Sequence, residues 1–235
     1  MKTPCLAAGR WFALALAAAG AGTTPFPGSA AELSGGQIVD EVVAVVGTRG
    51  REARVITLTK VTEEGRIALV SRGGIEAAFA RLDGAVLRAS LDWYVDQLLL
   101  LDEAERLKVF EVDQATAQAE LVRFKAEFPD PRNYGAFLRE IDVGEEELLA
   151  SLRRSVRVRR YLESRLGRLR ATPGEVAAWY AAHAAEFGGR PLAEVSDEIA
   201  ARLSAARADA ETKTLLSDLR GRADIRVLVD LGKRP

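Results

Sequence analysis

Residue types that commonly perform catalysis are scarce in this sequence. His183, in the stretch WYAAHAAEF, is the only histidine, and Cys5 is the only cysteine. A nucleophilic triad needs a nucleophile beside a base, and no G-x-S-x-G pattern accompanies this histidine. A zinc site needs a cluster of histidines or cysteines, which one of each cannot form. We therefore expect no catalytic residues, no metal and no cofactor, and interpret His183 as a packing or solvent-facing residue, with pH sensing as the alternative.

Neighbouring carboxylates are a second candidate for chemistry, because paired acids can exchange protons with a substrate. Glu63 and Glu64 form one cluster, and residues 145–147 form another. Both clusters fall in the first turn of an expected helix, where acidic side chains stabilise the helix dipole. The glycine pairs at 35–36, 73–74 and 188–189 match no phosphate-binding motif. A structural role for the acids is therefore the preferred interpretation.

Arginines are concentrated in one expected helix, GEEELLASLRRSVRVRRYLESRLGRL. One interpretation is a solvated face whose arginines pair with neighbouring acids. The other is a surface for an anionic partner, such as acidic lipid headgroups or acidic segments of unfolded chains. The candidates for that surface are Arg153, Arg154, Arg157 and Arg160.

The aromatic residues fall into three groups at helical spacing. Such groups usually belong to a core. Adjacent aromatic residues on a helix point in different directions, however, so one member of a pair is available to line a groove. We accordingly regard all six as candidate peptide-binding residues. They are Trp93, Tyr94, Phe124, Phe128, Trp179 and Tyr180.

Helices must position most of these side chains. Thr59, Asp83, Asp113 and Thr172 each precede a helical pattern and are expected N-caps, and Thr172 has Glu175 three residues on for a capping box. The helix after Asp83 carries one continuous apolar stripe at spacings of three and four, which predicts a central helix. The stripe consists of Leu87, Leu91, Tyr94, Leu98 and Leu101.

Short strands are expected at both ends of this helical region. Residues 38–46 and 54–58 are β-branched and favour a hairpin, while Ile225, Val227 and Val229 alternate as in a strand with one buried face. A lone terminal strand cannot satisfy its backbone groups, so we expect it to pair with the hairpin. The predicted fold is mostly α with a small β element (α+β), a helical domain closed by the N-terminal hairpin and the C-terminal strand.

The N-terminal 31 residues differ in composition from the rest. Lys2 and Arg10 precede a short apolar run, and small residues follow at 29 and 31, which is the order of a cleaved secretory signal. A retained amphipathic anchor is the alternative. The net charge of −1 becomes more negative without these two cations, which argues against nucleic-acid binding. Over 235 residues, 48% hydrophobic, there is enough apolar material for a core.

Several stretches, in this order, resemble the SurA-like periplasmic chaperones, which are related to PrsA and PpiD. IVDEVVAVVGTRG with ARVITLTKV is similar to the family's N-terminal hairpin and first helix, and LDWYVDQLLLLDEAERLKVFEVDQATAQAEL to its long helix. ATPGEVAAWYAAHAAEF looks like the helix that leads to its isomerase domain. PLAEVSDEIAARL with LLSDLRGRADIRVLVD resembles the C-terminal helix and strand that return to the hairpin.

The chain departs from this family at one junction. Relatives commonly carry a parvulin-type prolyl isomerase domain there, whereas only residues 188–190 separate the two motifs in this chain. The resemblance thus implies a signal peptide (1–31), a chaperone core (32–170), a junction helix and loop (171–190), and a C-terminal helix and strand that pack back on the core (191–235).

The same resemblance implies a function without catalysis. It predicts a periplasmic, ATP-independent holdase that binds unfolded or extended polypeptides, chiefly outer-membrane or secreted proteins, with no isomerase activity. The net charge separately predicts no nucleic-acid partner. Two alternatives stay open. One is an assembly or adaptor module that docks a specific partner or an anionic membrane surface, and the other is a prolyl isomerase.

Overall fold

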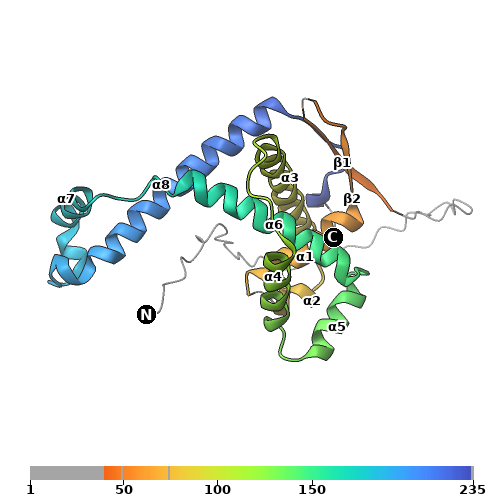
Figure 1. Ribbon diagram of the computed structural model, residues 1–235, viewed down its shortest axis with the longest axis horizontal. Helices are drawn as coiled ribbons and strands as arrows, with labels where there is room; N and C mark the ends of the chain where they lie inside the picture. Colours follow the sequence, from red (N-terminus) through yellow and green to blue (C-terminus); the bar gives the residue numbers. More distant parts are fainter. Residues whose placement is uncertain (1–39, 49, 74, 234–235) are drawn as a thin grey trace, which may run out of the picture. The chain divides into compact units, whose positions relative to one another are not determined.

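The computed structural model describes residues 40–48, 50–73 and 75–233 (Figure 1). The expected signal peptide at 1–31 lies outside this range. Among the described residues, no helix combines the length and apolar composition that a bilayer crossing requires.

A small antiparallel sheet joins the two ends of the described chain. β1 (Val42–Gly47) is its central strand, with β2 (Arg54–Thr57) on one side and β3 (Asp224–Val227) on the other. The β-branched run VVAVV favours the extended backbone of β1. The prediction of an N-terminal hairpin paired with the C-terminal strand is therefore confirmed.

The register of the sheet separates a buried face from an exposed one. Val45 lies opposite Val55 of β2 and Arg226 of β3, and Val55 is 60% exposed. In the adjacent row, Ala44 lies opposite Ile56, and both side chains are buried. Successive residues of a strand point to opposite faces, so the sheet covers the helices with one face and leaves the other to solvent.

The connection between β1 and β2 is anchored to a helix by one carboxylate. Asp102 is 8% exposed and accepts a hydrogen bond of 2.9 Å from the Thr48 hydroxyl. Arg51 lies 3.1 Å from the same carboxylate, and Arg54 also forms an ion pair with it. Charge-assisted contacts of this kind are among the stronger hydrogen bonds, and they hold the long loop of the hairpin in place.

Two helices follow the hairpin and form the centre of the fold. α1 (Leu58–Ser71) packs on α3 (Gly84–Arg106), with the short α2 (Ile75–Phe79) between them in sequence. Asp83 caps α3 as predicted, accepting a hydrogen bond from the amide of Val86 at 2.8 Å.

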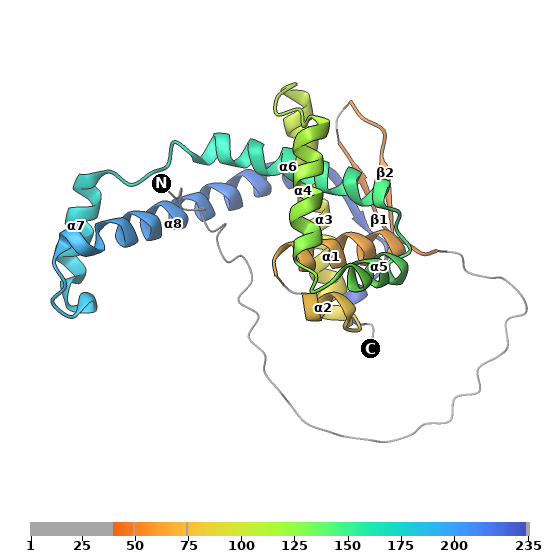
Figure 2. The same cartoon turned by 60° about the horizontal axis from the view of Figure 1, so that its bottom comes forward.

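Three further helices complete the main body. α4 (Gln114–Ala126), α5 (Pro131–Glu140) and α6 (Glu145–Leu166) follow in order, and α4 packs against α6 (Figure 2). Asp113 caps α4 as predicted, with its carboxylate 2.6 Å from the amide of Thr116.

The last two helices pack against each other. α7 (Pro173–His183) begins at the predicted capping box, in which Glu175 accepts from the Thr172 amide at 2.8 Å. A short 3₁₀ turn (Ala184–Phe187) follows, and α8 (Leu192–Arg222) then runs to β3.

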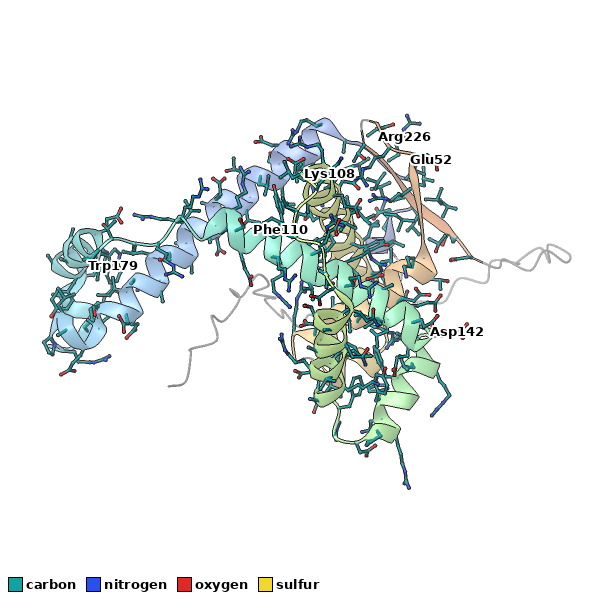
Figure 3. The ribbon with its side chains drawn as sticks, viewed as in Figure 1. Glu52, Lys108, Phe110, Asp142, Trp179 and Arg226 are labelled. Atoms are coloured by element: carbon teal, nitrogen blue, oxygen red, sulfur yellow. The ribbon has the colours of Figure 1, made fainter. Side chains whose placement is uncertain are left out.

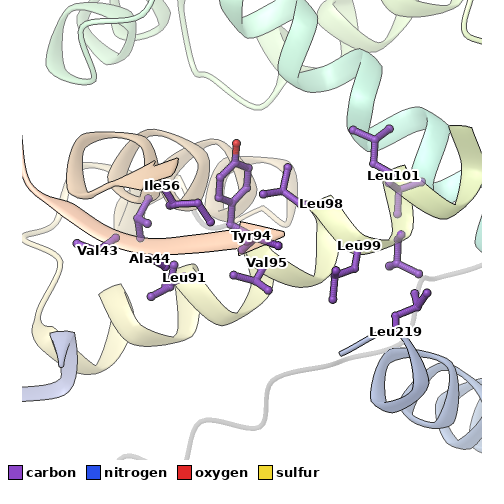
Figure 4. Close-up of a cluster of buried hydrophobic side chains, with 14 of the residues drawn as sticks. Val43, Ala44, Ile56, Leu91, Tyr94, Val95, Leu98, Leu99, Leu101 and Leu219 are labelled. Atoms are coloured by element: carbon purple, nitrogen blue, oxygen red, sulfur yellow. The ribbon is translucent and has the colours of Figure 1, made fainter. Parts of the chain in front are cut away.

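Buried apolar side chains form three clusters. The first lies between the sheet, α3 and the end of α8, and includes the predicted stripe of α3 (Figure 4). The second lies among α1, α4, α5 and α6, where Phe137 is fully buried. The third lies between α7 and the start of α8, around Val176, Val195 and Ile199.

One expected N-cap was wrong. α1 begins at Leu58, and its N-cap is Thr57 instead of Thr59. Thr57 keeps an extended backbone (φ −99°, ψ 162°) as the last residue of β2, and its hydroxyl accepts a hydrogen bond from the Lys60 amide at 3.3 Å. The strand therefore passes directly into the helix without a connecting loop.

The expected burial of the C-terminal strand was wrong in part. β3 ends at Val227, and the side chain of Val227 is 43% exposed although it lies on the buried face of the sheet. The reason is its position, because β3 is an edge strand with a neighbour on one side only.

Candidate functional site

The helices α1, α3 and α6 leave a shallow hollow where they meet. Its enclosed part measures ≈ 10 Å³, about the space of one water molecule. Pockets for small molecules are of the order of several hundred Å³, so this hollow suits a side chain or a peptide edge instead. It is lined by Trp93, Tyr94, Gln97, Leu98 and Leu101 of α3, Glu64 of α1, and Ser151, Arg154, Ser155 and Val158 of α6.

Two lining side chains are available for hydrogen bonds. Gln97 and Ser155 are partly exposed, and within the described part of the chain neither side chain has a hydrogen-bond partner. Gln97 lies one helical turn after Trp93, so both side chains lie on the same side of α3. An apolar wall with a few polar groups is the composition of a peptide-binding surface.

A buried ion cluster forms the floor of the hollow. Glu64 is 3% exposed, and its carboxylate accepts hydrogen bonds from the Ser151 hydroxyl and from the Arg154 guanidinium, each at 2.6 Å. Lys60 adds a contact of 3.2 Å. Burial lowers the pKa of Lys60, but Glu64 and the neighbouring Glu63 outweigh it and hold that pKa above its usual value.

This cluster positions helices and does not activate a nucleophile. The Ser151 side chain is 2% exposed and donates to a carboxylate that two cations already compensate. A substrate atom cannot reach this oxygen without opening the packing between α1 and α6. Burial raises the pKa of Tyr94, and the charge of Glu64 adds to the shift, so the phenol stays protonated beside the cluster.

The four predicted arginines all have partners within the protein. Arg153 donates to the Gln114 side chain, Arg154 to Glu64, and Arg160 to the Glu111 carbonyl and the Thr116 hydroxyl, both at 3.2 Å. Arg157 lies 3.7 Å from Glu105. These contacts tie α6 to α1, α3, α4 and the chain that precedes α4. The structure thus places Arg154 in the hollow, and the other three along the α6 contacts with α3, α4 and the segment before α4.

The six predicted aromatic residues do not share one groove. Trp93 and Tyr94 line the hollow, and the Arg72 guanidinium lies 5.5 Å from the centre of the Trp93 ring. Phe124 and Phe128 are buried in the second cluster, 3% and 7% exposed. The Trp179–Tyr180 pair belongs to the third cluster.

His183 packs against Trp179, at the side of the third cluster. Its ring stacks on that of Trp179, with centroids 4.1 Å apart and planes 10° apart, and its Nδ1 lies 2.9 Å from the Trp179 carbonyl oxygen. Figure 3 labels Trp179. Arg202 covers Trp179, 4.8 Å from the ring centre. Across the described ranges, no group of three or more His, Cys, Asp or Glu side chains is arranged to hold a metal ion. These contacts support the interpretation of His183 as a packing residue.

Sequence reasoning considered Trp93, Tyr94, Arg154 and Glu64 for binding or chemistry, and it missed the other six lining residues, which are Gln97, Leu98, Leu101, Ser151, Ser155 and Val158. A usable signal was present for two of them. Gln97 is a polar residue beside the apolar stripe of α3, one turn after Trp93, and Ser155 stands one turn after Ser151 in an arginine-rich helix. Comparison with known proteins gives no further guidance, because no family model, curated protein or solved structure matches this chain.

Proposed function

We propose that this protein is a periplasmic, ATP-independent chaperone that holds unfolded outer-membrane or secreted polypeptides and catalyses no prolyl isomerisation. The observation that carries this proposal is the hollow between α1, α3 and α6. It offers Trp93 and Tyr94 for apolar contact, and Gln97 and Ser155 for hydrogen bonds to a peptide backbone. Its enclosed volume is too small for a cofactor or metabolite, whereas an extended chain needs only a surface strip.

The neighbouring arginines bear on the choice between functions. A membrane-docking or adaptor surface needs cations that are free to meet an anionic partner. Arg153, Arg154, Arg157 and Arg160 instead contact acids, an amide or oxygen acceptors of the same chain. We therefore place the holdase ahead of the adaptor module.

The first experiment measures suppression of aggregation. A urea-unfolded porin is diluted into buffer with the full chain, and light scattering is recorded over a range of molar ratios. Wild type should suppress scattering, Trp93→Ala should suppress it less, and Trp179→Ala, a tryptophan of the third cluster, should behave as wild type. Absence of suppression by folded wild-type protein at several-fold excess would rule out the holdase.

The second experiment locates the client. With Cys5 replaced by serine, a photo-crosslinker attached at Gln97→Cys should capture an unfolded porin, because Gln97 lines the hollow. The same reagent at Ser217→Cys, an exposed position of α8, is the matched control. Equal capture at both positions would exclude the hollow as the binding surface, and capture of one folded protein alone would favour the adaptor.

A further inference from the structure

Among the described residues, the edge strand β3 pairs with β1 alone, so the backbone groups on its outer side meet no other strand. The amide of Leu228 donates to the Val43 carbonyl at 2.9 Å, which fixes the direction of that residue's backbone groups toward β1. In an antiparallel pair, alternate residues bond to the same neighbour. Arg226 and Asp224 therefore bond to β1, whereas the N–H and C=O groups of Ile225 and Val227 point away from the sheet.

Side chains along this edge are also open. Val227 and Leu228 are 43% and 57% exposed, and the side chains of Asp224 and Arg226 are 62% and 70% exposed. Apolar residues on an edge strand with free backbone groups form a template for another strand. The edge thus provides both the hydrogen-bonding groups and the apolar contacts of a β-pairing surface.

The charges on β3 are self-complementary. Arg226 and Asp224 of the same chain already form an ion pair of 2.7 Å on the outer face of the strand. When two such strands run antiparallel about a two-fold axis at Ile225, Asp224 of each copy lies opposite Arg226 of the other. All four charges then have neighbours of opposite sign, along the strand and across it.

We propose that β3 pairs antiparallel with β3 of a second copy of this chain about a two-fold axis at Ile225, which joins the two sheets into one. The interface is isologous and closed, as expected for a dimer. It would form whether or not the protein binds unfolded clients.

The register follows from the charges and the backbone together. Ile225 lies opposite itself in this arrangement, and the two copies exchange a pair of N–H···O bonds there. Moving the axis to Arg226 keeps the bonding pattern but places two arginines opposite each other, which is unfavourable. An axis between Ile225 and Arg226 would place Ile225 of one copy opposite Arg226 of the other. The backbone N–H and C=O groups of Ile225 would then face a residue whose own backbone groups point toward β1 and cannot accept or donate across the interface.

The paired segment is short on both sides of the axis. α8 ends at Arg222, and the amide of Ala223 already donates to the Arg220 carbonyl at 3.2 Å. With the axis at Ile225, the cross-strand pairs therefore involve Asp224, Ile225 and Arg226 of each copy, and Val227 of the second copy lies beside Ala223.

The experiment is a charge exchange on the full chain, with mass in solution measured by sedimentation over a range of concentrations. Wild type should reach the dimer mass. Asp224→Arg and Arg226→Asp each replace two attractive cross-strand pairs with repulsive ones, so each should raise the dissociation constant at least about tenfold. A mixture of the two variants should form a heterodimer, because every pair across that interface is again of opposite sign.

Two controls separate this interface from other causes. Arg190→Glu and Glu194→Arg reverse an exposed ion pair away from the sheet and should leave the dissociation constant unchanged. Hydrogen exchange adds a readout that needs no variant, since the Ile225 amide should become protected as concentration rises, while the Arg226 amide stays protected throughout. A monomeric wild type, dimers unaffected by either reversal, or variants that fail to associate when mixed would each overturn the proposal.

Discussion

Replacing Glu64 with alanine tests the central polar contact of the fold. The change removes a carboxylate that is 3% exposed and leaves the Ser151 hydroxyl, 2% exposed, without its acceptor. A buried donor left unpaired costs about 1–3 kcal/mol. The side chains of Arg154 and Lys60 are 35% and 37% exposed, so water can solvate both cations once Glu64 is gone. Loss of their two ion pairs with Glu64 therefore costs only about 1 kcal/mol.

The total expected for Glu64→Ala is therefore about 3 kcal/mol of unfolding free energy. For a chain of this length that corresponds to a fall in Tm of about 6–12 °C. Urea unfolding followed by circular dichroism should show a lower midpoint with an unchanged slope. Glu146→Ala, at an exposed acid of α6, should stay within about 0.5 kcal/mol of wild type.

A double-mutant cycle with Ser151→Ala provides the decisive comparison. Once the hydroxyl is absent, loss of Glu64 no longer creates an unpaired donor, so the double variant should be more stable than the two single effects predict by about 1 kcal/mol. Strict additivity, or a loss below about 1 kcal/mol for Glu64→Ala alone, would refute the assignment of this cluster as a buried, mutually dependent unit.

Two further predictions concern α7 and the contact between α1 and α3. Hydrogen bonds from Arg207 and from Thr172 lower the pKa of Glu175 to about 2 from its usual 4.5, so the stabilisation they give is complete above pH 4.5 and is lost as the pH falls toward 2. The indole NMR resonance of Trp179 should therefore shift across this window in wild type, and a Glu175→Gln variant that shows the same shift would contradict the assignment. A Cβ on Gly65 would lie 2.6 Å from the Ser90 hydroxyl, so Gly65→Ala should lower the free energy of unfolding by about 1–3 kcal/mol. Addition of Ser90→Gly should recover part of that loss in the free energy of unfolding, measured with urea. If it recovers none, the contact between position 65 and Ser90 is not the cause of the loss.

Most of the fold was predictable from local signals. Asp83, Asp113 and Thr172 precede apolar periodicity at the positions where caps are needed, so the starts of α3, α4 and α7 follow from the residues themselves. The start of α1 was harder, because two threonines, Thr57 and Thr59, are both competent caps. The choice between them depends on where pairing of β2 with β1 ends.

The candidate site was less predictable, because it is assembled from three helices. Aromatic character singled out Trp93, which lines the hollow, but it gave no means to separate Trp93 from Phe124, which is 3% exposed. The arginine-rich pattern of α6 is likewise compatible with a free surface and with a packed one. Only the tertiary position of acceptors such as Glu64 and Gln114 decides between them.

Pairing of β1 with β3 has a consequence for how the chain acquires its structure during synthesis. β1 is made first among the described elements, yet one of its two neighbours is made almost last. Contacts between residues so distant in sequence form late, because the intervening chain must first be ordered. Until β3 is made, β1 keeps one side unpaired, so that side is open to pairing with other strands while the helices between β1 and β3 form.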